Sequence, residues 1–169
     1  QDFSLHAKAG ELHCVVGPNG AGKSTLMRII NGQVSSSEQI HMQISLRHIT
    51  ADVRSAHDIP SALYDCVALV EQKFDRMLAP SFTARENLQL ANMPRYPTLS
   101  ALPEFCDVAN LLVKVALPLD RVVGRMSGGQ RQILAILMML QRSPWVLLLD
   151  EPSAALDVRN TQLVFEFLR

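Results

Sequence analysis

Hydrophobic residues along this chain form two kinds of pattern, short continuous runs and longer stripes with helical spacing. Continuous runs of four or five mostly apolar residues occur at 12–16, 66–70 and 145–149. Runs of this length are typical of strands that are covered on both faces, as in a parallel sheet. Two other stretches, 3–8 and 40–49, alternate apolar and polar residues, which predicts a strand in the first and a strand or hairpin in the second.

The middle of the chain carries helical patterns instead. Residues 103–116 place their apolar side chains on one stripe, and residues 133–140 form a long apolar helix pattern. Thr83 is followed three residues later by Glu86, which is the capping-box pattern of a helix N-terminus. Residues 75 to about 140 are therefore predicted to be mainly helical and to form an insertion between two strand-rich parts of an α/β domain.

Polar and proline-containing stretches separate these elements. Residues 50–60 and 73–82 are predicted to be loops, because neither keeps an apolar period and both contain proline. The last residues, 157–169, have helical spacing, and Asp157 is expected to cap that helix. The sequence contains no internal repeat and no low-complexity segment.

Composition narrows the class of protein. The chain has 169 residues, enough for one domain with a sizeable core, and its 16 basic residues equal its 16 acidic ones. This balance gives no indication of a bulk electrostatic partner such as nucleic acid. No apolar run approaches the roughly 20 residues that span a bilayer, and the first residues lack the features of a signal peptide. Three widely separated cysteines are most simply reduced core thiols of a cytosolic protein; they are Cys14, Cys66 and Cys106.

One glycine-rich stretch carries the clearest chemical signal. It fits the phosphate-loop pattern G-x-x-x-x-G-K-[ST] at every fixed position. Its residues are Gly17, Pro18, Asn19, Gly20, Ala21, Gly22, Lys23 and Ser24, followed by Thr25. A predicted strand precedes the stretch and a helical pattern follows it, so backbone N–H groups and a helix N-terminus are placed to bind phosphate. Lys23 can reach the β- and γ-phosphates and the Ser24 hydroxyl can ligate Mg²⁺, whereas the alternative for this stretch alone is a ligand-free turn.

Two further stretches suggest chemistry. Residues 126–130 form a short polar turn before the long apolar helix, and alone they are compatible with either an anion site or an ordinary helix cap. The predicted strand at 145–149 ends in two carboxylates, Asp150 and Glu151. Paired acids at a strand end suit Mg²⁺ ligation by one and activation of water by the other. An acidic turn without such a role is the alternative.

Taken together, these motifs closely resemble the nucleotide-binding domain of ABC ATPases. The glycine loop is similar to that family's Walker A motif, residues 126–130 to its signature sequence, and residues 146–151 to its Walker B motif. Gln72 resembles the Q-loop glutamine, and residues 153–157 resemble the D-loop. The resemblance covers essentially the whole chain. It implies an α/β P-loop NTPase (RecA-like) core with a mainly parallel sheet, an N-terminal antiparallel β part and an inserted helical subdomain.

The resemblance also implies a role for each motif. The whole glycine loop and Thr25 would bind ATP. The residues expected to act in hydrolysis are Glu151, Lys23 and Gln72. The expected Mg²⁺ ligands are Ser24, Gln72 and Asp150. Because two such domains pack head to tail in this family, the residues expected to face the ATP of the opposite subunit are Ser127, Gly128, Gly129 and Gln130. Asp157 would lie at the same interface.

The function implied by the resemblance is ATP hydrolysis that powers transport across a membrane, with ATP and Mg²⁺ as cofactors. The expected partners are a second ABC ATPase domain and a transmembrane permease subunit, and no nucleic acid is expected. Residues 81–88 resemble the segment that faces the membrane subunit. The expected location is cytoplasmic, peripheral on the inner face of the cell membrane. The alternatives are a soluble ABC ATPase acting on ribosomes or nucleic acid and a degenerate domain that binds ATP without cleaving it.

We expect a single ABC ATPase domain over residues 1–169, truncated at both ends. Residues 1–74 and 141–169 would form the catalytic core, and residues about 75–140 the helical subdomain. The family's base-stacking aromatic residue and its switch histidine are not found, since all five histidines precede the signature. Arginines that are usual in the family are replaced by Ile133 and Met138. The chain is therefore expected to be a fragment that is unstable or aggregates by itself.

Overall fold

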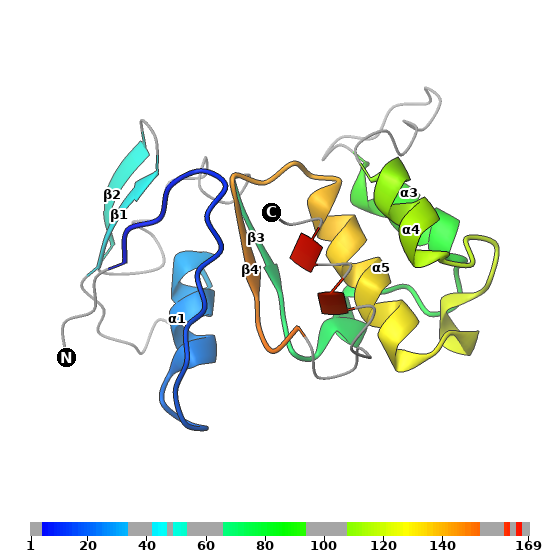
Figure 1. Cartoon of the computed structure of the whole chain (residues 1–169), viewed down its shortest axis with the longest axis horizontal. Coiled ribbons are helices and arrows are strands. Elements are labelled where there is room, and N and C mark those ends of the chain that lie inside the picture. Colours follow the sequence, from blue (N-terminus) through cyan, green and yellow to red (C-terminus); the bar gives the residue numbers. More distant parts are fainter. Residues whose placement is uncertain are drawn as a thin grey trace.

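The computed structural model describes residues 5–33, 42–46, 49–53, 66–93, 108–152, 161–162 and 165–166. Its strands are β1 (Met42–Leu46), β2 (Ile49–Val53), β3 (Val67–Val70) and β4 (Val146–Leu149). Its α-helices are α1 (Lys23–Ile30), α3 (Ala84–Ala91), α4 (Ala109–Val115) and α5 (Gly128–Leu140). Two short 3-10 helices, η2 (Phe74–Met77) and η3 (Val123–Arg125), lie between them. Figure 1 shows the order of these elements in space.

A parallel pair of strands lies at the centre of the molecule. β3 and β4 pair in register, with Val70 opposite Leu149, and the Asp150 N–H extends the ladder by donating to the Val70 carbonyl at 2.9 Å. Helices α1 and α5 both contact β3 and lie on opposite sides of the pair (Figure 1). The strands predicted at 66–70 and 145–149 are thus confirmed, although β4 is half-buried because the helices pack chiefly against β3.

The second sheet is an antiparallel hairpin. β1 pairs with β2 so that Met42 lies opposite Val53 and Leu46 opposite Ile49. The predicted strand or hairpin at 40–49 is therefore confirmed in its described part. The loop predicted at 50–60 is wrong for 50–53, because these residues continue the alternation of β2 and form a ladder with β1.

The N-terminal strand predictions are wrong where the structure describes those residues. No described residue of 3–8 or 12–16 belongs to a strand, and the side chains of Leu12 and Val16 are 52% and 87% exposed. A short apolar run becomes a strand only when a neighbour supplies a hydrogen-bond ladder. Within the described residues, β3 has that ladder with β4 alone. The turn predicted between the two runs is present, with Gly10 at φ +80°.

The hydrophobic core is built around α5, which lies between the parallel strands and helices α3 and α4 (Figure 1). Seven consecutive residues of α5, 132–138, are buried. The other large contributors to this core are Val70, Phe74, Leu78, Leu88, Val108, Leu112, Leu117, Val123 and Met126. The apolar helix predicted at 133–140 is therefore confirmed and begins earlier, at Gly128.

Helix α3 begins with the predicted capping box. The Glu86 N–H donates to the Thr83 hydroxyl at 3.2 Å, and the Glu86 carboxylate accepts from the Thr83 N–H at 2.7 Å. These hydrogen bonds, from the Thr83 backbone first and from its hydroxyl second, lower the pKa of Glu86 below its ordinary value.

The remaining helix predictions are confirmed only in part. The helix predicted at 103–116 is observed as α4, and residues 103–107 lie outside the described part of the chain. The predicted loop at 73–82 contains η2. In the segment 157–169 only 161–162 and 165–166 are described, and they are helical. The division into catalytic core and helical subdomain stays a prediction.

Candidate functional site

The glycine loop leads directly into α1, and left-handed glycines shape it. Gly20 and Gly22 have φ values of +82° and +90°, a conformation that is strained for residues with a Cβ atom. Gly22 is the N-cap of α1 and the helix has no side-chain cap. The Ala21 N–H closes the turn onto the Pro18 carbonyl at 3.2 Å. The N-terminus of α1 therefore presents its first-turn N–H groups and its positive dipole end without a competing side chain.

Lys23 folds back onto the same loop. Its Nζ donates to the carbonyl oxygens of Gly17 at 2.8 Å and Pro18 at 2.9 Å. The next residue, Ser24, is half-buried and Thr25 is exposed. The ammonium group thus lies inside the loop on neutral oxygen acceptors, which phosphate oxygens would replace with stronger, charge-assisted bonds.

The carboxyl ends of β3 and β4 bring two predicted site residues into contact. The Gln72 side chain donates through Nε2 to Glu151 Oε2 at 2.6 Å, although 79 positions separate them along the chain. Parallel strands end at the same edge of a sheet, and this contact follows from that topology. Glu151 has a left-handed backbone, with φ +52°, which is uncommon for a residue that is not glycine. Figure 1 shows the glycine loop and these strand ends toward the same, lower side.

The signature residues form the start of α5. The Gln130 N–H donates to the Ser127 hydroxyl at 3.2 Å, and the Gln130 side chain accepts from the Ser127 N–H at 3.1 Å. This reciprocal capping box shows that the turn caps α5, and its role as an anion site stays a prediction. The two side-chain hydrogen bonds of this turn both stay between Ser127 and Gln130. Asp157 lies outside the described residues.

The donor set suits Mg²⁺ better than a transition metal. Within the described residues there is no cluster of three or more His, Cys, Asp or Glu side chains. The side chains of Ser24, Gln72 and Asp150 offer hydroxyl, amide and carboxylate oxygens. Mg²⁺ prefers such oxygen ligands and completes its shell with water and substrate phosphates.

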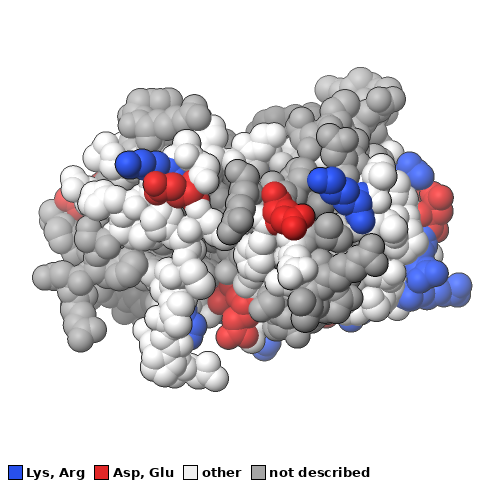
Figure 2. Space-filling model, viewed as in Figure 1, with Lys and Arg blue, Asp and Glu red and all other residues white. Residues whose placement is uncertain are grey.

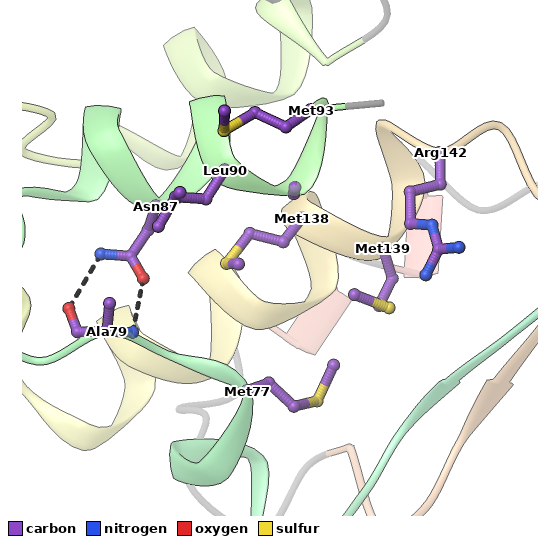
Figure 3. A pocket seen from close by; sticks show the side chains of 9 residues that line it. Met77, Ala79, Asn87, Leu90, Met93, Met138, Met139 and Arg142 are labelled. Carbon is purple, nitrogen blue, oxygen red and sulfur yellow. Dashed lines mark hydrogen bonds between the residues drawn. The ribbon is translucent and has the colours of Figure 1, made fainter. Parts of the chain in front are cut away.

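A pocket that the sequence patterns did not predict opens between η2, α3 and α5 (Figure 3). It has a volume of about 520 Å³. Four of the chain's seven methionines line it, namely Met77, Met93, Met138 and Met139. Arg142 adds one cation at the rim, and buried Asn87 bonds through both side-chain atoms to Ala79. No local motif marks this pocket, because its residues come from three separate elements.

Comparison with known proteins identifies the family. A family model described as ABC transporter matches residues 1–154. The chain belongs to the ABC transporter family. It matches the part of that family that binds ATP, because the curated relatives reported below are all named as ATP-binding proteins.

The relatives include both import and export proteins. The chain is 32% identical to the nickel import ATP-binding protein LarO of Lactiplantibacillus plantarum, over 100% of this chain and 69% of LarO. It is 36% identical to a tyrosine transport ATP-binding protein of Clostridioides difficile, over 98% of this chain and 66% of that protein. It is also 36% identical to the Nod factor export ATP-binding protein I of Burkholderia orbicola, over 99% of this chain and 52% of the relative. The chain thus spans between about half and about two thirds of their lengths.

Solved ABC cassettes share the fold. The dimeric, post-hydrolysis structure of the ATP-binding cassette MJ0796 with ADP and Pi superposes with a TM-score of 0.72 at 26% identity. The match covers 97% of this chain and 70% of that one. The predicted P-loop NTPase fold class is therefore confirmed. This ABC domain is of the ATPase type, and the described part contains no helix that is long and apolar enough to cross a membrane.

The charged surface of this ABC domain shows no single-sign face in the view of Figure 2. Basic and acidic side chains are interspersed among uncharged ones there. This agrees with the equal numbers of basic and acidic residues in the whole sequence.

Proposed function

We propose that the chain binds MgATP, hydrolyses it as a head-to-tail dimer and thereby powers transport across a membrane. The observation that carries this proposal is the 2.6 Å hydrogen bond between Gln72 and Glu151 at the ends of β3 and β4. It joins the two residues whose motifs resemble the Q-loop and Walker B. The import and export relatives support transport, and the dimeric, post-hydrolysis state of the MJ0796 cassette supports hydrolysis in a dimer.

Phosphate binding is assigned to the glycine loop. ATP phosphates would accept hydrogen bonds from the N–H groups at the start of α1, where no side chain caps the helix. Lys23 Nζ would exchange the carbonyl oxygens of Gly17 and Pro18 for phosphate oxygens. The residues assigned to ATP binding are Gly17, Pro18, Asn19, Gly20, Ala21, Gly22, Lys23, Ser24 and Thr25.

Mg²⁺ would be held by Ser24, Gln72 and Asp150, whose oxygen donors fit it. When bound, the ion neutralises charge on the phosphates. The Asp150 N–H is fixed to the Val70 carbonyl, so the backbone that carries this carboxylate is tied to the sheet. This anchoring keeps the carboxylate at the strand end where the Gln72 side chain also lies.

Glu151 is assigned to the attacking water. One of its oxygens, Oε2, already accepts a hydrogen bond from Gln72, which orients the carboxylate. The second carboxylate oxygen can then accept a hydrogen bond from the attacking water, which makes that water a stronger nucleophile. The left-handed backbone of Glu151 turns the chain immediately after β4.

The signature turn is assigned to the second subunit's ATP. Ser127, Gly128, Gly129 and Gln130 begin α5, so the turn offers N–H groups, a hydroxyl and a helix N-terminus to a γ-phosphate. Asp157 is assigned to the same interface from its sequence motif. Neither half-site surrounds the γ-phosphate alone, and therefore hydrolysis requires the dimer.

A permease subunit is the proposed membrane partner, with this domain peripheral on the inner face of the membrane. The pocket of Figure 3 supports such a partner, because four methionines, two alanines and Leu90 line it and one cation, Arg142, lies at its rim. Methionine side chains adapt to differently shaped apolar groups. The pocket borders α3, whose first turn lies in the predicted membrane-facing segment 81–88.

The test is molar mass by light scattering on the Glu151→Gln protein, with and without MgATP. We expect ATP to double the mass, while steady-state hydrolysis falls at least about 100-fold relative to the unmutated protein. Glu166→Gln, at another exposed glutamate, is the matched control and should leave hydrolysis unchanged. A Glu151→Gln protein that binds ATP but stays monomeric would contradict the head-to-tail dimer.

A further inference from the structure

An ion pair joins the segment after Gln72 to the helix that begins with the signature. Arg131 Nε lies 3.3 Å from Asp75 Oδ1. Asp75 belongs to η2, which starts two residues after Gln72. Arg131 belongs to the first turn of α5, where its N–H donates to the Ser127 carbonyl at 3.0 Å. The pair therefore adds a direct side-chain contact between the two proposed half-sites of one subunit.

Because Arg131 Nε is buried, moving Asp75 away from it costs free energy. The atom is enclosed by protein and has no hydrogen bond of good geometry in the described part of the chain. The Asp75 carboxylate is the anion that faces it, and its side chain is 61% exposed. The Arg131 side chain as a whole is 33% exposed, so loss of Asp75 would leave the enclosed Nε without this counter-charge while the rest of the guanidinium stays partly hydrated. Displacement of η2 relative to α5 is therefore resisted at Arg131.

Packing in the core couples the short helix η2 to α5. Phe74, the neighbour of Asp75, is buried in the core cluster that α5 dominates, whereas Gln72 is exposed. One short segment thus has an exposed end that bonds Glu151 and a buried end that packs in the core with α5. A change at the exposed end is passed to α5 by Phe74 through packing and by Asp75 through charge.

We propose that Asp75 and Arg131 are positioning residues that fix the start of α5 to the segment carrying Gln72. When Gln72 changes hydrogen-bond partner on nucleotide binding, the ion pair carries the displacement to Ser127 and the signature turn. Neither residue touches the substrate. This inference rests on the proposed function, because it needs the signature turn to act on a second subunit's ATP.

The experiment uses the Glu151→Gln protein and adds Asp75→Asn or Arg131→Gln. Two quantities are measured: ATP affinity of the monomer with a fluorescent nucleotide, and the ATP concentration at which half of the protein is dimeric. We expect each substitution to raise the ATP concentration for half-dimerisation about fivefold, which corresponds to the loss of one partly exposed ion pair. The ATP affinity of the monomer should stay within about twofold. Arg131→Lys keeps the charge and should restore most of the loss, as should the exchanged pair Asp75→Arg with Arg131→Asp.

A second ion pair supplies the matched control. Arg85 Nη2 lies 3.1 Å from Asp120 Oδ1 in the same helical region. Neither residue is next to Gln72 or the signature turn in the sequence. Asp120→Asn should leave both quantities unchanged. The proposal is overturned if Asp75→Asn lowers the melting temperature but not the dimerisation response, or if Asp120→Asn has the same effect on dimerisation. A Glu151→Gln protein that binds ATP without dimerising overturns the proposed function itself, and this inference with it.

Discussion

Helices α5 and α1 differ in how far they are buried in the rest of the domain. Seven consecutive residues of α5 are buried, whereas no residue of α1 is. The run before α1, at 12–16, is also mostly exposed. Local features determine the shape of the glycine loop instead, namely two left-handed glycines and the hydrogen bonds of Lys23. The buried core and the glycine loop that we propose to bind phosphate therefore lie in different parts of this domain.

This difference shows how a binding loop can remain open to a ligand without weakening the fold. A loop that packs little can change its hydrogen-bond partners while the core stays intact. Binding of a ligand would then stabilise the part of the domain that packs least in the ligand-free protein.

Truncating the core should cost far more stability than truncating α1. Leu134 is fully buried in α5, and Leu134→Ala should lower the free energy of unfolding by about 2–5 kcal/mol. Leu26, half-buried in α1, should cost about 1 kcal/mol or less on the same change. Urea unfolding followed by circular dichroism measures both values. Equal losses at the two leucines would show that α1 belongs to the same cooperative core.

Lys23→Ala should remove stabilisation by nucleotide without changing the ligand-free protein. At an ATP concentration of about 100 times its Kd, binding adds about 2.7 kcal/mol, which the variant should lose. Its unfolding free energy without ATP should stay within about 0.5 kcal/mol, because the partners of Lys23 Nζ among the described residues are the loop carbonyls of Gly17 and Pro18. Thermal melts with and without MgATP measure this, with Lys114→Ala, at an exposed position of α4, as the control. A large loss in the absence of ATP would refute the separation.

The cap of α3 should give the smallest effect, visible as a pH dependence. The folded state lowers the pKa of Glu86, so this group stabilises the protein above its unfolded pKa. That contribution is lost as pH falls through the ordinary glutamate value, 4.5, toward the folded pKa. In Glu86→Gln the side chain can still cap α3 but does not titrate. The difference in melting temperature between this variant and the unmutated protein should therefore shrink from pH 7 to pH 3.5. A constant difference would mean that Glu86 does not titrate between these conditions.

The parts of the fold that the sequence predicted well are those that local pattern and burial determine together. The run at 66–70 became β3, and the capping box predicted at Thr83 begins α3. The strand predicted at 12–16 failed, because strand formation there depends on a neighbour's ladder that the run itself cannot specify. The second strand of the hairpin was partly missed, since Thr50 and Asp52 made its alternation look like a polar loop.

Site residues show the same division. The glycine loop could be identified from consecutive residues, because its motif specifies backbone geometry directly. The contact of Gln72 with Glu151 needed the parallel pairing of β3 with β4 before the distance could be known. The Asp75–Arg131 pair and the methionine-lined pocket have no local signature, because their members come from separate elements that only packing brings together.

The reciprocal cap of Ser127 and Gln130 has a consequence for how the proposed dimer opens. Each partner of that cap already has a hydrogen bond within its own helix. A γ-phosphate arriving from the second subunit would exchange these bonds for others, so the net gain is smaller than the number of new contacts suggests. When phosphate departs, the helix recovers its own cap at once. In the proposed dimer, the turn would therefore keep its hydrogen bonds satisfied both with and without the phosphate, which lowers the free-energy cost of separating the two subunits after hydrolysis.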